Sequence, residues 1–219
     1  NNKHISYNFR KGYNLLWNEQ ESADHIFSEI FIGDCYPIGD DKKGKNVIVD
    51  VGANIGLFTF YAHMKFPNSK IISIEANPNN FKILEKNINN NKLNDVVKIF
   101  NYVVSLNEGH QPFYLSSNSG WSSIYDKRGA KDGELIYLEP ISLSNLFQKN
   151  NLTIIDILKI DIEGAEYDIL LNDKFFDNYH IKELIVEVDK KPRDDRYSYS
   201  KLIIFLQKIY KYVKINNPK

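Results

Sequence analysis

The chain has 219 residues, of which 28 are Lys or Arg and 28 are Asp or Glu, so its formal net charge is zero. This balance argues against broad electrostatic attraction to nucleic acid or to an acidic membrane surface. A hydrophobic content of 42% is too high for a disordered chain, and the length suits one globular domain. Mean hydropathy is −0.42 and no apolar run approaches the roughly 18 residues of a membrane helix, so we expect no membrane span.

The cysteine content and the N-terminus bear on location. Cys35 is the single cysteine, so neither an internal disulfide nor a cysteine-based zinc site is expected. The first residues, Asn-Asn-Lys-His, lack the apolar run of a secretion signal. Together these features favour a cytoplasmic location.

Residues 1–45 precede the first clear sheet strand and contain an amphipathic helical stretch at 23–30. We expect this segment to cover the main domain, residues 46–219.

From residue 46 onward, short β-branched runs alternate with helical patterns. Strands are predicted at 46–51, 70–76, 97–105, 154–162 and 181–188. Helices are predicted at 55–65, 78–91, 164–171 and 199–210. Two more strands, 111–115 and 134–138, flank a polar stretch and indicate an inserted hairpin. The alternation predicts an α/β fold with a mainly parallel sheet and helices on both faces.

The chain ends soon after its last predicted helix, 199–210. Residues 212–216 are predicted to begin one more strand, and the chain ends at Lys219. We therefore expect either a truncated C-terminus or a sheet edge completed by the hairpin, by the N-terminal segment or by a second copy in a homo-oligomer.

The turn after the first strand carries a cofactor signal. Asp50 ends the strand, and Gly52 and Gly56 in the sequence Gly-Ala-Asn-Ile-Gly place bare backbone where open α/β sheets bind ligands. Free amides at the following helix N-terminus favour an anionic group there. The alternative is a tight strand–helix turn without a ligand. Positions 52, 54 and 57 hold Gly, Asn and Leu rather than three glycines, which weakens the reading as a nicotinamide-dependent oxidoreductase.

The second predicted strand ends in Glu75, followed by Ala76 and Asn77. Glu75 lies 19 residues after Gly56, close to the roughly 20 at which a carboxylate meets an adenosine ribose in related sheets. The alternative is that Glu75 stabilises the N-terminus of the next helix.

These motifs together resemble a known family. The pattern D-x-G-x-N-x-G at 50–56 resembles motif I of class I S-adenosylmethionine-dependent methyltransferases. With IEANP at 74–78, NYVVS at 101–105 and LKIDIEGAE at 158–166, most of residues 46–190 resemble the FkbM methyltransferases. The resemblance implies a Rossmann-like class I fold, S-adenosylmethionine as cofactor, and O-methylation of a saccharide or small natural product. It implies cofactor contacts from Asp50, Gly52, Asn54, Gly56, Glu75, Ala76, Asn77 and Asn101.

The acids of the LKIDIEGAE run are the candidate catalytic groups. Lys159, Asp161 and Glu163 share one side by the period of two along a strand. A hydroxyl that accepts a methyl group must lose its proton, and a carboxylate can take it. Asp161 is the first candidate for this base and Glu163 the second, with Lys159 lowering their pKa values. The alternative is a structural ion-pair cluster.

Other features leave alternatives open. The five histidines form no close ligand pattern, so no transition-metal site is predicted, and His180 is the histidine to test as another base. Asp161, Glu187 and Asp189 are the weaker candidates for a hard divalent cation. The loop 118–123, with its serines and Trp121, suits a glycan or small-molecule acceptor. A catalytically silent cofactor-binding module of the same fold is the other alternative.

Overall fold

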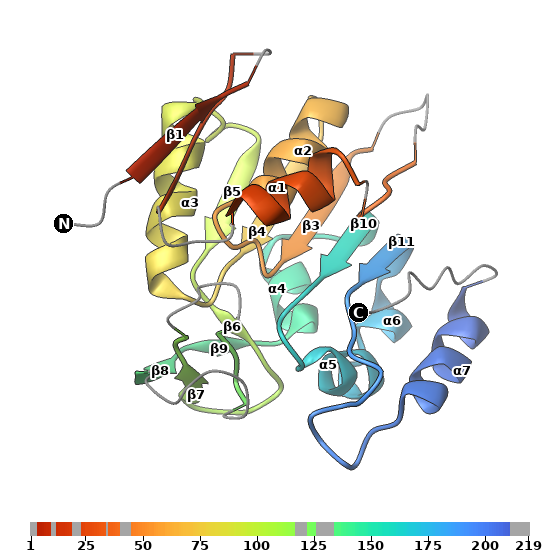
Figure 1. Cartoon of the computed structure of the whole chain (residues 1–219). Coiled ribbons are helices and arrows are strands. Elements are labelled where there is room, and N and C mark those ends of the chain that lie inside the picture. The colour runs from red at the N-terminus through yellow and green to blue at the C-terminus, as the bar shows by residue number, and fades with distance from the viewer. Residues whose placement is uncertain are drawn as a thin grey trace.

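The computed structural model describes residues 4–9, 12–18, 23–33, 35–39, 45–116, 122–125 and 134–210. A five-stranded sheet in the order β11-β10-β3-β4-β5 forms its centre, and all four strand pairs are parallel (Figure 1). The strands are β3 (Val47–Val51), β4 (Lys70–Ile74), β5 (Val97–Phe100), β10 (Ile154–Ile160) and β11 (His180–Val186). The predicted α/β, Rossmann-like fold with a mainly parallel sheet is confirmed.

Helices cover both faces of this sheet. One face carries α1 (Ala23–Phe31), α2 (Leu57–Lys65) and α3 (Pro78–Asn90). The other carries α4 (Leu143–Lys149), α5 (Glu166–Asn172), α6 (Phe175–Asn178) and α7 (Tyr199–Ile209). Successive strand residues alternate between the two cores, with Ile48 in the first and Val49 in the second. Because both faces are buried, the strands read as continuous apolar runs.

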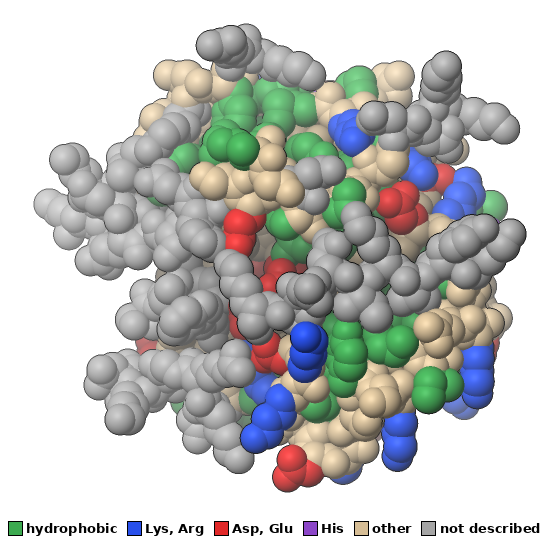
Figure 2. Space-filling model, turned by 45° about the vertical axis from the view of Figure 1, so that its right-hand side comes forward, with side chains coloured by type: hydrophobic (Ala, Val, Ile, Leu, Met, Phe, Trp, Pro, Cys, Tyr) green, Lys and Arg blue, Asp and Glu red, His purple; other side chains and the backbone are tan. Residues whose placement is uncertain are grey.

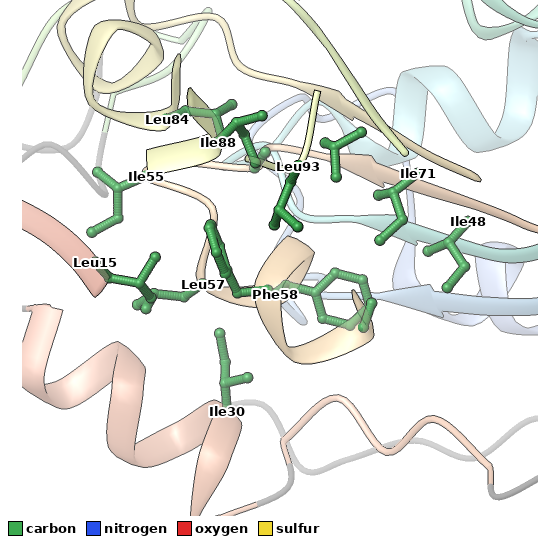
Figure 3. Close-up of a cluster of buried hydrophobic side chains, with 14 of the residues drawn as sticks. Leu15, Ile30, Ile48, Ile55, Leu57, Phe58, Ile71, Leu84, Ile88 and Leu93 are labelled. Carbon is green, nitrogen blue, oxygen red and sulfur yellow. The ribbon is translucent and has the colours of Figure 1, made fainter. Parts of the chain in front are cut away.

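The N-terminal segment packs on the α2–α3 side of the sheet. It begins with an antiparallel hairpin of β1 (His4–Asn8) and β2 (Asn14–Asn18), which the sequence analysis missed. Leu15 and Ile30 are buried against the core around Leu57 (Figure 3). The Asn87 side chain on α3 fixes β2, since its Oδ1 accepts from the Leu16 amide at 2.7 Å. The described part of residues 1–45 is therefore built into the first core.

The third predicted strand, 97–105, is divided into two. β5 ends at Phe100, and β6 (Val103–Val104) pairs in parallel with β9 (Pro140–Ile141) in a separate small sheet. The break lies at Asn101, whose amide donates to the carbonyl oxygens of Glu75 and Ala76 at 2.8 and 3.0 Å. The single-strand prediction was wrong because this side chain holds the end of β4 while the backbone leaves the sheet.

The inserted hairpin is confirmed. β7 (Gln111–Tyr114) pairs antiparallel with β8 (Leu135–Leu138), below the main sheet in Figure 1. The strand predicted at 212–216 lies outside the described residues. Among the helices that the structure describes, none has the length and apolar character needed to traverse a bilayer.

Candidate active site

The glycine turn at the carboxyl end of β3 is tightly packed against β10. Gly52 has a φ of 80°, and its amide donates to the carbonyl oxygen of Ile74 at 2.9 Å. A Cβ added to Gly52 would lie 1.8 Å from the carbonyl oxygen of Asp161. A Cβ on Gly56, where φ is 100°, would lie 2.8 Å from a methyl group of Leu84. Both positions therefore require glycine, which leaves bare backbone at the mouth of the turn.

Glu75 joins this turn to the next helix. Its Oε2 accepts from the amide of Asn54 at 2.7 Å, and its Oε1 accepts from the amide of Asn77 at 2.8 Å. Burial raises the pKa of Glu75 to about 7, although these two hydrogen bonds oppose the shift. Gly52 and Glu75 are thus parts of one wall, because the amide of Gly52 bonds to the residue before Glu75.

The other predicted cofactor residues line the same edge of the sheet. Asn77 caps α3, since its Oδ1 accepts from the Asn79 amide at 2.9 Å. Asn101 is exposed and bonds to the backbone of Glu75 and Ala76. The structure therefore brings the glycine turn, Glu75, Ala76, Asn77 and Asn101 together at the carboxyl ends of β3, β4 and β5.

Asp50 lies beneath the turn rather than in it. Its side chain is 0% exposed, its Oδ2 accepts from the Thr59 hydroxyl at 2.7 Å, and its Oδ1 lies 3.4 Å from Nζ of Lys159. Burial raises the pKa of Asp50, opposed by Lys159 and the Thr59 hydrogen bond. Lys159 also donates to the carbonyl oxygen of Gly52 at 2.9 Å. Asp50 and Lys159 thus fix the turn from below.

We expect the Thr59→Val variant to be less stable by about 1–3 kcal/mol, because Asp50 would lose a buried hydrogen-bond donor without a change in side-chain shape. Urea unfolding measures this cost. Thr59→Ser keeps the hydroxyl and serves as the control, which should unfold closer to the wild type. Equal stability of Thr59→Val and wild type would show that the Thr59 bond does not support Asp50.

The candidate base Asp161 belongs to a cluster of four polar side chains. Its Oδ2 lies 3.4 Å from Nζ of Lys159 and 2.9 Å from the hydroxyl of Tyr36. That hydroxyl also lies 2.8 Å from Oε2 of Glu187, which directly follows β11. Burial opposes the charge of Lys159, but Asp161 and Asp50 raise the pKa of Lys159, so it stays cationic. On the face shown in Figure 2, acidic side chains gather in a hollow.

Glu163 lies apart from this cluster, so the prediction that it shares a side with Lys159 was wrong. Its φ is 59°, and its carboxylate pairs with Arg193 at 3.1 Å. The left-handed backbone ends the alternation of the strand. Burial and the charge of Asp161 raise the pKa of Glu163 to about 7, and the cation that opposes this rise is Arg193 rather than the expected Lys159.

Arg193 and Glu163 hold the loop between the two hairpin strands, β7 and β8. The Ser123 hydroxyl donates to the Glu163 carbonyl oxygen at 2.7 Å and accepts from Nη1 of Arg193 at 2.9 Å. Ser122 accepts from the Asn77 amide at 3.3 Å. Residues 118–121 of the predicted acceptor loop, including Trp121, lie outside the described residues. Ser122 therefore ties this loop to Asn77, and Ser123 ties it to the turn after β10.

The remaining predictions concern metal and histidine. In the described part of the chain, no three His, Cys, Asp or Glu side chains are grouped to hold a metal ion. Asp161 and Glu187 instead share the Tyr36 hydroxyl.

His180 is the first residue of β11 and pairs in register with Ile154, the first residue of β10. It therefore lies at the opposite end of the sheet from Asp161, and its selection as an alternative base was wrong.

Sequence reasoning missed several residues of the site. Tyr36 comes from the N-terminal segment, and no local pattern pointed to it. Glu166 is buried and accepts from the amides of Ile162 and Gly164, both at 2.8 Å, which shapes the turn after β10. Burial raises the pKa of Glu166 to about 8. Its position in the LKIDIEGAE run was the signal that could have identified it.

Comparison with known proteins places this arrangement in a family. Residues 50–213 match the methyltransferase FkbM domain. The methyltransferase sdnD of Sordaria araneosa is 30% identical over 196 residues, covering 75% of this chain and 74% of the relative. The 31-O-demethyl-FK506 methyltransferase FkbM of Streptomyces tacrolimicus is 26% identical, covering 76% and 74%. A precorrin-6y C5,15-methyltransferase structure from Geobacter metallireducens covers 76% of this chain and 62% of its own, with 14% identity and a TM-score of 0.43.

The family match spans the glycine turn, Glu75, the LKIDIEGAE run and Glu187. The chain is therefore a methyltransferase that belongs to the FkbM family.

Proposed function

We propose that this methyltransferase transfers the methyl group of S-adenosylmethionine to a hydroxyl oxygen of a saccharide or another small natural product. The donor assignment depends on one observation, the glycine turn held to Glu75 through the Asn54 amide. The relative from Streptomyces tacrolimicus is named as a methyltransferase of 31-O-demethyl-FK506, which supports an oxygen acceptor. The family match disfavours the alternative of a nicotinamide-dependent oxidoreductase.

The glycine turn, Glu75, Ala76, Asn77 and Asn101 form what we call the cofactor wall, and this wall fits an adenosyl donor. A Cβ at Gly52 would collide with the carbonyl oxygen of Asp161, so only glycine lets the turn lie this close to the end of β10. Each Glu75 oxygen accepts one hydrogen bond from a backbone amide. Each oxygen can still accept another hydrogen bond from a ribose hydroxyl. We assign Gly52, Asn54 and Gly56 to the sugar and methionine part, and Ala76, Asn77 and Asn101 to the base. Asp50 supports the turn from beneath.

The acceptor side is formed by the acids at the ends of β10 and β11. When bound, the donor supplies an electrophilic methyl carbon on a positively charged sulfur. Asp161 receives the proton of the attacking hydroxyl, and Lys159 holds Asp161 in place through its 3.4 Å ion pair. Glu163 with Arg193 positions the loop that contains Ser123 beside the acceptor. Positioning of acceptor and donor supplies much of the rate.

We expect donor affinity to depend on ionised Glu75. Because ribose hydroxyls donate to a carboxylate, affinity for S-adenosylhomocysteine should fall by up to about tenfold per pH unit below the Glu75 pKa of about 7. Glu75→Gln should bind more weakly at pH 8 and lose most of this pH dependence. Calorimetry of both proteins from about pH 5.5 to about pH 8 measures the effect. Identical pH profiles would remove Glu75 from the ribose contact.

Transfer of labelled methyl from S-adenosylmethionine tests the reaction itself. The protein is incubated with the labelled donor and with extracts of glycans, nucleotide sugars and hydroxylated natural products. The proposal expects label in an acceptor of this class, attached through oxygen. Donor binding without labelling of any extract would favour the catalytically silent module.

A further inference from the structure

We propose that Tyr36 is a positioning residue that joins Asp161 and Glu187 into one proton-accepting group, so that the proton released by the acceptor hydroxyl is shared across the tyrosine hydroxyl. The inference rests on the proposed function, because it names what happens to the proton of that reaction. It assigns a role in the reaction to the N-terminal segment, which the sequence left without one.

The Tyr36 hydroxyl makes two short contacts but has only one hydrogen. The Tyr36 oxygen lies 2.9 Å from Oδ2 of Asp161 and 2.8 Å from Oε2 of Glu187, both at hydrogen-bond distance. A tyrosine hydroxyl has one hydrogen and donates it to one carboxylate at a time. The second short contact is satisfied when the other carboxyl carries a proton and donates to the tyrosine oxygen. Both contacts of the Tyr36 hydroxyl can therefore be hydrogen bonds at the same time only when Asp161 or Glu187 carries a proton.

The surroundings keep Tyr36 in its neutral form. Burial and the charges of Asp161 and Glu187 raise the pKa of Tyr36 well above its usual range. Its ring packs edge-on against Phe58, with centroids 5.6 Å apart, and lies 5.3 Å from Nζ of Lys159. The hydroxyl thus remains a donor that can also accept, and its ring is held in one place.

The charged groups around Glu187 define its titration. Loss of water raises the pKa of Glu187, as do the charges of Asp161 and Glu29, whereas the Tyr36 hydrogen bond and Lys159 lower it. Cys35 also faces this cluster, and burial raises the pKa of its thiol to about 11, so it stays uncharged. The negative charge of Asp161, which Tyr36 links to Glu187, therefore stabilises a proton on Glu187.

The proton step balances without another reactant. The acceptor oxygen forms a bond to the methyl carbon, and the carbon–sulfur bond breaks with its electron pair moving to sulfur. The hydroxyl proton passes to Asp161. Asp161 then donates a proton to the Tyr36 oxygen while Tyr36 gives its own to Glu187. Glu187 is the more exposed carboxylate, so it can release the proton to water.

An NMR titration of protein labelled with ¹³C at its Asp and Glu carboxyls tests this inference without donor or acceptor. Glu187→Gln identifies the Glu187 signal. In Tyr36→Phe, Glu187 loses a hydrogen bond to its ionised form, so its midpoint should rise by about one pH unit. Tyr13→Phe, in the same segment with its ring against Phe60, is the control and should change nothing. An unchanged midpoint in Tyr36→Phe would overturn the inference.

Asp161→Asn provides a second, independent titration if Tyr36→Phe does not fold. Removal of the neighbouring negative charge should lower the Glu187 midpoint, and an unchanged midpoint would equally overturn the shared proton. Calorimetry with S-adenosylhomocysteine is run on the same samples. If the titration shifts appear as expected but the donor does not bind, the result counts against the proposed function and not against this inference.

Discussion

Gly52→Ala is expected to destabilise the fold by about 2–5 kcal/mol and to abolish detectable donor binding. The positive φ of 80° costs an alanine about 1–2 kcal/mol, and the overpacked contact costs about 1–3 kcal/mol more. The added Cβ would lie 1.8 Å from backbone, which cannot rotate away as a side chain would. The ends of β3 and β10 must therefore separate, which distorts the turn that we assign to the cofactor. Urea unfolding and calorimetry measure the two effects.

Gly109→Ala is the matched control for this substitution. Gly109 also has a φ of 80°, but a Cβ there would meet nothing within 4 Å. We expect it to cost about 1–2 kcal/mol through backbone strain alone and to leave donor binding intact. Equal costs at both glycines would show that strand crowding at Gly52 is unimportant.

Asp161→Asn is expected to reduce methyl transfer by about 10²–10⁴-fold while affinity for S-adenosylhomocysteine stays within a factor of about two. An asparagine fits the same space, but its amide cannot take the proton of the acceptor hydroxyl. The Asp161 side chain pairs with Lys159, which in turn donates to the Gly52 carbonyl oxygen, and Asp161 is not among the residues assigned to the donor, which is why binding should persist. The comparison of turnover and calorimetry separates the two roles.

Asp173→Asn is a control for loss of a carboxylate elsewhere. Asp173 is buried at the C-terminal end of α5 and accepts from the Leu143 amide at 2.8 Å, so it holds the start of α4 and has no contact with the acceptor cluster among its hydrogen bonds to described residues. Its substitution should reduce stability and leave the turnover of folded enzyme unchanged. Full methyl transfer by Asp161→Asn would exclude Asp161 as the base.

The cofactor wall could be predicted from the sequence because its signals are local. Gly52, Gly56 and Glu75 lie within one strand–helix–strand unit, so spacing alone places them at one edge of the sheet. Asn101 follows the next strand along and falls at the same edge. Their contacts with a bound donor remain predictions.

The acceptor side could not be predicted in the same way. Tyr36 meets Asp161 and Glu187 across 125 and 151 residues of chain, and single-sequence patterns do not report such contacts. The period of two failed at Glu163 because the backbone there is left-handed, with φ at 59°. The alternation of side chains applies only within β10, which ends at Ile160, whereas Glu163 lies in the turn that follows.

Some elements were missed although a signal was present. α4 begins after Ser142, whose hydroxyl accepts from the Asn145 amide at 3.1 Å in an ordinary N-cap. The seven-residue helix was too short for its apolar period to stand out.

The division of the predicted strand 97–105 had no local signal. Asn101 interrupts this strand through side-chain bonds to Glu75 and Ala76, and a pattern of strand propensities does not report such bonds.

Calorimetry of the wild-type chain with S-adenosylhomocysteine, and separately with NAD, tests the central claim most directly. The account predicts saturable binding of S-adenosylhomocysteine with a stoichiometry of about one, at the glycine turn beside Glu75, and no binding of NAD. Binding of NAD, or no binding of S-adenosylhomocysteine by folded protein, would contradict it.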